Sequence, residues 1–171
     1  MSSTGVDVDT PAGRSVEPTA SRPAAVLVGF MGAGKSTVGR LLADRLGVDF
    51  IDTDHEIVRR TGRSIPDIFV TDGADRFREL EAEVVADVLS THTGIVALGG
   101  GAVTTRTVRD ALDSHRVFYL KVSAESGFER VRESDRPLLA SDDPAQRYRA
   151  LLAEREETYS AVAGVDICLF Y

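Results

Sequence analysis

The chain has 171 residues, of which 43% are hydrophobic and 27% charged, and its formal net charge is −7. This length suits one domain with a sizeable core. The acidic balance argues against nucleic acid as the main partner, because binding a phosphate backbone needs clustered basic surface. There is no apolar run long enough to span a membrane, and the lone cysteine, Cys168, excludes an intramolecular disulfide. We therefore expect a single-domain cytoplasmic protein with Cys168 as a core thiol.

Residues 1–23 are rich in Ser, Thr, Pro, Gly and Ala, contain no aromatic residue and show no helical or strand period. This composition is typical of a disordered tail. The segment also lacks the basic start and the apolar stretch of a targeting peptide. We therefore place the folded domain at residues 24–171.

The most informative stretch is residues 26–38, with the sequence VLVGFMGAGKSTV. A strand predicted at residues 24–28 leads into a glycine-rich loop, and a helix predicted at residues 37–46 follows. The spacing is that of a P-loop, in which N–H groups bind phosphate oxygens, a lysine neutralises the outer phosphates and a hydroxyl binds Mg²⁺. It predicts a nucleotide-phosphate site made of Gly32, Ala33, Gly34, Lys35, Ser36 and Thr37, with Ser36 as the metal ligand.

A second predicted strand, at residues 48–52, ends in Asp52, Thr53 and Asp54. Because ligands gather at the carboxyl ends of parallel strands, both carboxylates should face the phosphate site. The alternative is that they cap the short helix predicted at residues 56–60. We interpret the pair as functional, while one of the two carboxylates can also serve as the cap.

A helix predicted at residues 74–90, after a break at Gly73, places Glu81 in the middle of its apolar face and Arg78 at the edge. A carboxylate in that position needs a partner. An arginine held by such a carboxylate is suited to grip an anionic substrate. A purely structural ion pair is the alternative.

Gly99, Gly100 and Gly101 follow a third strand, predicted at residues 94–98. Three glycines after a buried strand are unfavourable unless a ligand or another backbone approaches closely. We interpret them as backbone donors to a substrate, with a tight turn as the alternative.

The second half of the domain supplies two more arginines. A helix is predicted at residues 106–112, a strand at 117–122, helices at 123–133 and 144–162, and a last strand at 165–170. Arg136 lies in the polar loop at residues 134–143, where it could act from a mobile lid on a transferring phosphoryl group; an ordinary exposed loop is the alternative. Arg155 lies in the apolar stripe of its helix and needs an anionic partner unless its stem reaches the edge.

Taken together, these residues resemble the shikimate kinase family over about residues 24–165. The resemblance rests on GFMGAGKST at 29–37, DTD at 52–54, FRELE at 77–81, GGGAV at 99–103, RPLL at 136–139, and an arginine and a tyrosine at 155 and 159. It implies an α/β fold with a five-stranded parallel sheet of order 2-3-1-4-5, flanked by helices and carrying a lid loop. Nucleoside monophosphate kinases have a related fold.

The resemblance also implies an enzyme that transfers the γ-phosphate of ATP to the 3-hydroxyl of shikimate, in aromatic amino-acid biosynthesis. The family uses Mg²⁺ and is usually monomeric. The implied catalytic residues are Lys35, Asp54 and Arg136.

The same resemblance assigns the binding residues. ATP would be bound by the P-loop residues, with Arg130 over the adenine and Arg136 over the phosphates. Mg²⁺ would be held by Ser36 and, through water, by Asp52. Shikimate would be held by Asp54, Arg78, Gly99, Gly100, Gly101 and Arg155, with Glu81 orienting Arg78.

One departure concerns the end of the sequence. In the family, the fifth strand continues into a loop against the adenine and then into a final helix, whereas this sequence stops at Tyr171. We therefore expect the adenine wall and the last helix to be missing, and the ATP site to be weakened. Two alternative functions remain: another small-molecule P-loop kinase, such as a gluconate kinase, and a non-catalytic remnant that binds ATP or shikimate without turnover.

Overall fold

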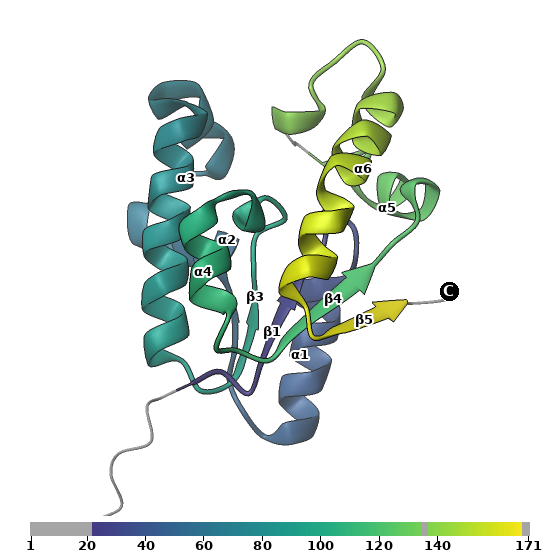
Figure 1. Cartoon of the computed structure of the whole chain (residues 1–171). Coiled ribbons are helices and arrows are strands. Elements are labelled where there is room, and N and C mark those ends of the chain that lie inside the picture. The colour runs from purple at the N-terminus through teal and green to yellow at the C-terminus, as the bar shows by residue number, and fades with distance from the viewer. Residues whose placement is uncertain (1–21, 135–136, 169–171) are drawn as a thin grey trace, which may run out of the picture.

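A five-stranded sheet forms the centre of the computed structural model, which describes residues 22–134 and 137–168 (Figure 1). All strand pairs are parallel, and the order is β2-β3-β1-β4-β5. The strands are β1 (Ala25–Val28), β2 (Phe50–Asp52), β3 (Ile95–Ala97), β4 (Val117–Lys121) and β5 (Val165–Cys168). The fold class and strand order implied by the family resemblance are confirmed.

Helices cover both faces of this sheet. They are α1 (Lys35–Leu46), α2 (Thr53–Thr61), α3 (Ile65–Thr91), α4 (Arg106–Leu112), α5 (Ala124–Val131) and α6 (Pro144–Val162), with 3₁₀ turns at Ala102–Thr104 and Pro137–Leu139. Side chains alternate across a strand, so Val26 and Val28 of β1 join an apolar cluster with α3, α4 and α6. Ala25 and Leu27 join a second cluster with α1 on the other face.

Several local predictions are confirmed, and two change. Gly73 interrupts α3 with φ 85° and ψ 168°, a conformation that only glycine adopts readily. The helix predicted at residues 56–60 is longer, because the Asp52 side chain accepts hydrogen bonds from two N–H groups in its first turn and so starts α2 at Thr53. Cys168 is exposed on the edge strand β5, so its prediction as a core thiol is wrong.

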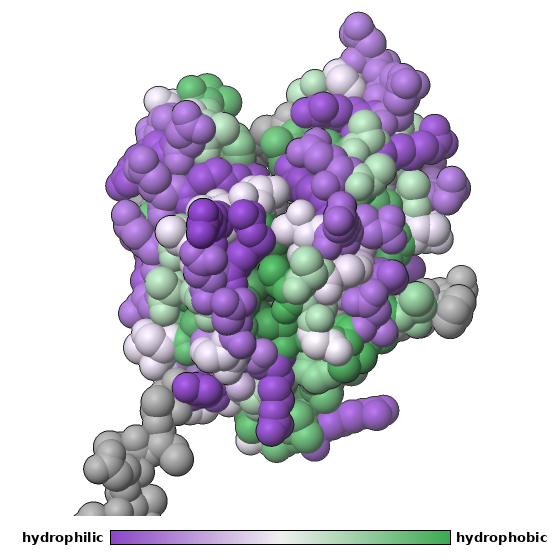
Figure 2. Space-filling model, viewed as in Figure 1, coloured by the Kyte–Doolittle hydropathy of each residue, from purple (hydrophilic) through white to green (hydrophobic). Residues whose placement is uncertain are grey.

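The carboxyl ends of the strands hold the functional part of the fold. β1 leads into the P-loop, β2 into Asp52 and Asp54, and β3 into the three glycines. Because the strands are parallel, these loops meet at one edge of the sheet, where they line a cavity of about 620 Å³. The space-filling view is hollowed there, between the ends of α3 and α6 (Figure 2). Over the described ranges, no helix is both long and apolar enough to cross a membrane.

Candidate active site

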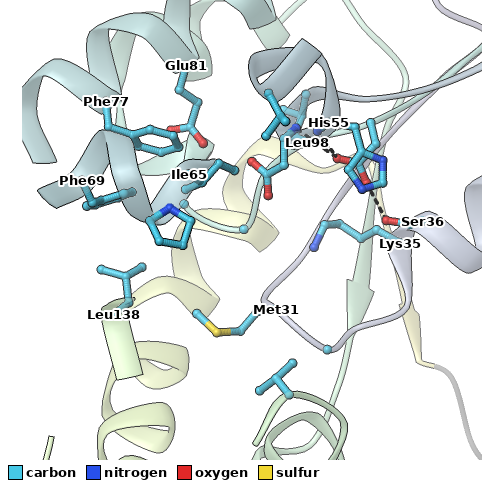
Figure 3. A pocket seen from close by; sticks show the side chains of 18 of the residues that line it. Met31, Lys35, Ser36, His55, Ile65, Phe69, Phe77, Glu81, Leu98 and Leu138 are labelled. Atoms are coloured by element: carbon cyan, nitrogen blue, oxygen red, sulfur yellow. Dashed lines mark hydrogen bonds between the residues drawn. The ribbon is translucent and has the colours of Figure 1, made fainter. Parts of the chain in front are cut away.

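The P-loop is shaped to present N–H groups to an anion. Gly32 and Gly34 adopt left-handed φ angles of 81° and 88°, which glycine tolerates without strain. Within the described residues, neither of their N–H groups has a recorded protein acceptor. The Lys35 ammonium donates to the carbonyls of Gly29 at 2.7 Å and Phe30 at 3.2 Å, and its side chain extends into the cavity (Figure 3). Unpaired N–H groups and a cation at a helix N-terminus form a phosphate-binding nest.

Ser36 and Asp52 meet at the edge of this nest. The Ser36 hydroxyl donates to Asp52 Oδ2 at 2.5 Å, and Asp52 Oδ1 accepts from the N–H of Asp54 at 3.0 Å. Asp52 therefore caps α2 and faces the cavity at once. The described residues contain no group of three or more His, Cys, Asp or Glu able to hold a metal. A hydroxyl and a carboxylate nevertheless fit Mg²⁺, which takes few protein oxygens and fills its shell with phosphates and water.

Arg78 and Glu81 form an ion pair on α3. The Glu81 side chain is 1% exposed, whereas that of Arg78 is 21% exposed and lines the cavity. Burial raises the pKa of Glu81 to about 6, and the Asp54 carboxylate adds to this effect, while Arg78 and Arg155 oppose it. The structure thus confirms that Glu81 is buried on the apolar face and paired with Arg78.

Side chains crowd this loop at two of the three glycines, Gly99 and Gly101. A Cβ on Gly101 would collide with the Arg78 guanidinium, and a Cβ on Gly99 would collide with the carboxylates of Asp54 and Glu81. The N–H of Gly99 donates to the buried Thr53 hydroxyl at 2.9 Å. Those of Gly100 and Gly101 have no recorded acceptor within the described residues. The Ala102 N–H donates to the Gly99 carbonyl at 3.1 Å, so these residues form a tight turn that also admits the close approach of side chains.

Arg155 reaches the same loop from α6. It is 7% exposed, and its Nη1 lies 3.5 Å from the Gly100 carbonyl. Its buried Nε has no hydrogen-bond partner in the described chain, while its guanidinium stacks 5.5 Å from the centre of the Phe30 ring. The side chain faces the cavity and does not extend to the helix edge. A buried cation with an unused donor favours an anionic ligand.

An apolar wall completes the cavity. It is formed by side chains of α3 and of the Pro137–Leu139 turn, and Figure 3 shows several of them grouped on one side: Ile65, Phe69, Phe77 and Leu138. Sequence analysis missed this wall because apolar helix positions carry no mark that separates a core contact from a ligand contact. The cavity therefore combines cations and N–H groups with hydrocarbon, and the Arg78 guanidinium itself lies 5.3 Å from the centre of the Phe77 ring.

The remaining predicted residues have different outcomes. Ala33 is fully buried, does not line the cavity and donates its N–H to the Phe30 carbonyl at 3.1 Å, whereas Thr37 is exposed and lines the cavity. Arg130 lines the cavity and donates to the Gly32 carbonyl at 2.9 Å. Arg136 lies outside the described residues. Sequence analysis also missed the role of Thr53, since a hydroxyl between two acids gives no pattern that shows which loop it will meet.

A family model described as shikimate kinase matches residues 31–168. The chain belongs to the shikimate kinase family. Shikimate kinase of Mycobacterium avium is 53% identical over 146 residues, which are 85% of this chain and 83% of that protein. That of Thermobifida fusca is 52% identical over 148 residues, 86% of each chain.

Solved structures agree with this family membership. The shikimate kinase of Acinetobacter baumannii, determined in complex with shikimate, superposes with a TM-score of 0.84 at 42% identity and covers 89% of this chain and 86% of its own. A gluconokinase of Sinorhizobium meliloti reaches a TM-score of 0.55 at 18% identity over 88% of this chain. That likeness shows a shared fold and does not support gluconate as the substrate.

The pKa of Glu81 generates a prediction for this kinase. Above pH about 6 Glu81 is ionised and holds Arg78; as pH falls through this value it becomes neutral and Arg78 loses its partner charge. We expect kcat/KM for shikimate, measured from pH 5 to 8, to fall on the acid side of about 6. In Glu81→Gln, kcat/KM should be lower at neutral pH and should lack this step.

Two controls isolate the effect. ATP itself titrates near this pH, and its contribution remains in the Glu81→Gln profile, so the difference between the two profiles belongs to Glu81. Glu79→Gln changes an exposed carboxylate of the same helix, which pairs with Arg76, and should leave the profile unaltered. Identical profiles for wild type and Glu81→Gln would refute the assignment.

Proposed function

We propose that this cavity transfers the γ-phosphoryl group of ATP to the 3-hydroxyl of shikimate, giving shikimate 3-phosphate and ADP. One observation carries the proposal: a phosphate loop opens onto a cavity that is lined by two arginines, Arg78 and Arg155, and by an apolar wall. A small carboxylated ring with hydroxyls matches this combination of charge, N–H groups and hydrocarbon. The known activity of the family agrees with it.

Shikimate is oriented by its carboxylate. Arg78, held by Glu81, and Arg155, held against Gly100, converge on the cavity from α3 and α6. Two charge-assisted contacts of this kind fix both the position and the rotation of a carboxylate. The free N–H groups of Gly100 and Gly101 add donors, and the apolar wall packs against the ring.

The P-loop holds ATP next to the 3-hydroxyl of shikimate. Its N–H groups and Lys35 bind the β- and γ-phosphates. Arg130, on α5, contributes to ATP binding, and the same role is proposed for Arg136. Ser36 and Asp52 would hold Mg²⁺, which when bound neutralises charge on the phosphates. Most of the catalytic effect then comes from positioning and charge neutralisation.

Asp54 completes the reaction. It lies at the first turn of α2, lines the cavity, and is close enough to Glu81 to influence its ionisation. Asp54 accepts the proton of the 3-hydroxyl while the new O–P bond forms and the bond between the γ-phosphorus and the bridging oxygen of ATP breaks, releasing ADP. The proposal extends to a monomer acting in the cytoplasm, which size-exclusion chromatography and cell fractionation would test.

The first test is an ADP-release assay with ATP, Mg²⁺ and either shikimate or gluconate. We expect ADP release only with shikimate. Turnover with gluconate alone would replace the proposal by the gluconate kinase alternative. Binding of shikimate or ATP by calorimetry without any turnover would favour the non-catalytic alternative.

Lys35→Ala should lower kcat by about 10²–10³-fold, because charge on the transferring phosphoryl group loses a preorganised cation. The measurement is kcat at saturating shikimate and ATP. Lys121→Ala is a matched control. Lys121, on β4, does not line the cavity, and its Nζ lies 3.1 Å from Oδ2 of Asp166 on β5. Equal kcat values for the two variants would remove Lys35 from the mechanism.

Arg155→Ala should raise the KM for shikimate by about 10- to 100-fold, the loss of a charge-assisted hydrogen bond in a buried site, with little change in the KM for ATP. Steady-state kinetics with each substrate varied in turn measures both constants. Arg149→Ala, at an exposed position of the same helix, should change neither. An equal rise in both KM values would count against a carboxylate contact.

A further inference from the structure

Two tyrosines of α6, Tyr148 and Tyr159, take no direct part in the proposed reaction, yet both contact the loops that line the cavity. Both are fully buried, with 0% exposure. Burial raises the pKa of each phenol above its ordinary value, so both hydroxyls keep their proton at neutral pH and act as donors. Each donates to a backbone carbonyl of a cavity loop rather than to a ligand.

Tyr148 holds the P-loop from outside. Its hydroxyl donates to the Met31 carbonyl at 2.6 Å, across 117 residues of sequence. The ring packs edge-on against Phe30 at 4.8 Å and Phe128 at 5.9 Å between ring centres. A Cβ on Gly127 would occupy the place of the hydroxyl, so α5 is shaped to admit this contact.

The Met31 carbonyl belongs to the same peptide unit as the Gly32 N–H. Because a trans peptide is planar, the two groups point in opposite directions. Fixing the carbonyl on Tyr148 therefore fixes the Gly32 N–H, which has no recorded acceptor in the described chain. Arg130 anchors the next carbonyl, that of Gly32, at 2.9 Å. The outer carbonyls of the loop are thus tied down while an inner N–H group stays available for phosphate.

Tyr159 fixes a carbonyl of the glycine loop, residues 99–101, in the same way. Its hydroxyl donates to the Gly100 carbonyl, and its ring stacks on Tyr119 at 5.0 Å. The Gly100 carbonyl shares a peptide unit with the Gly101 N–H, which also has no recorded acceptor among the described residues. The contact therefore sets the direction of a donor on the shikimate side of the cavity.

The two tyrosines are eleven residues apart, which is close to three helical turns, so they lie on one face of α6. We propose that they are positioning residues with separate targets: Tyr148 orients the P-loop for the phosphates of ATP, and Tyr159 orients the glycine loop for shikimate. The assignment of the two loops to the two substrates rests on the proposed function. The hydrogen bonds themselves do not.

The test compares Tyr148→Phe with Tyr159→Phe, which each lose one hydroxyl and keep the ring. Removing the tyrosine donor from a buried carbonyl should weaken the dependent site by about tenfold in Tyr148→Phe. The effect should be smaller in Tyr159→Phe, because the Gly100 carbonyl keeps a longer contact with Arg155 Nη1 at 3.5 Å. We expect Tyr148→Phe to raise the KM for ATP and the Kd for ADP, with the KM for shikimate unchanged. Tyr159→Phe should raise the KM for shikimate and leave both nucleotide constants unchanged.

Tyr119→Phe is the matched control, because Tyr119 is 1% exposed and makes no recorded hydrogen bond to either loop; it should change none of the three constants. Gly127→Ala displaces the Tyr148 hydroxyl without altering the tyrosine, and should reproduce the nucleotide effect of Tyr148→Phe. Thermal melting by circular dichroism confirms that each variant is folded.

Two results would overturn the inference. Equal changes in the ATP and shikimate constants for both tyrosine variants, or a lower melting temperature with unchanged constants, would show a merely structural role and overturn the inference. The Kd for ADP, measured by calorimetry, tests the Tyr148 part even if the wild-type protein fails to phosphorylate shikimate. That failure would overturn the proposed function, while a weakened ADP affinity in Tyr148→Phe would still support the P-loop contact.

Discussion

The site depends on backbone N–H groups that have no partner within residues 22–134 and 137–168. A folded chain normally pairs its buried N–H groups, yet the two loops at the carboxyl edge of the sheet keep those of Gly32, Gly34, Gly100 and Gly101 available. The rest of the fold prevents these loops from turning inward. Lysine and tyrosine side chains hold their carbonyls, and the parallel strands fix where each loop begins.

The charged side chains around the cavity also favour an anionic ligand. Glu81 is buried with Arg78 as its partner, whereas Arg155 is buried with a weak carbonyl contact and an Nε that has no partner among the described residues. The charged residues that line the cavity are four cations and three carboxylates, which leaves a small local excess of positive charge: Lys35, Arg78, Arg130 and Arg155 against Asp52, Asp54 and Glu81. That excess suits an anion, although the net charge of the whole chain is −7. Local arrangement therefore outweighs overall charge in deciding what binds here.

Membership of the shikimate kinase family and the geometry of the cavity support each other through different observations. The family follows from similarity over most of the chain, whereas the proposed carboxylate contact follows from the two arginines that α3 and α6 contribute to the cavity lining. The gluconokinase with the same fold shows that the fold alone does not select the substrate.

The sequence by itself determined the elements whose signal is local. The spacing of the P-loop, the break at Gly73 and the 3.6-residue period that buries Glu81 beside Arg78 could all be predicted, because each depends on residues within a few turns. The strand order came from family resemblance. Only the tertiary structure decided which distant groups meet: the Thr53 hydroxyl with Gly99, the two α6 tyrosines with carbonyls of different loops, and Arg155 with the cavity rather than with solvent. The prediction for Cys168 was wrong because it rested on the apolar pattern of the strand alone, although the expected strand order puts this strand at an edge of the sheet. These contacts join residues far apart in sequence, and no local pattern encodes which partner a side chain finds once the chain has packed.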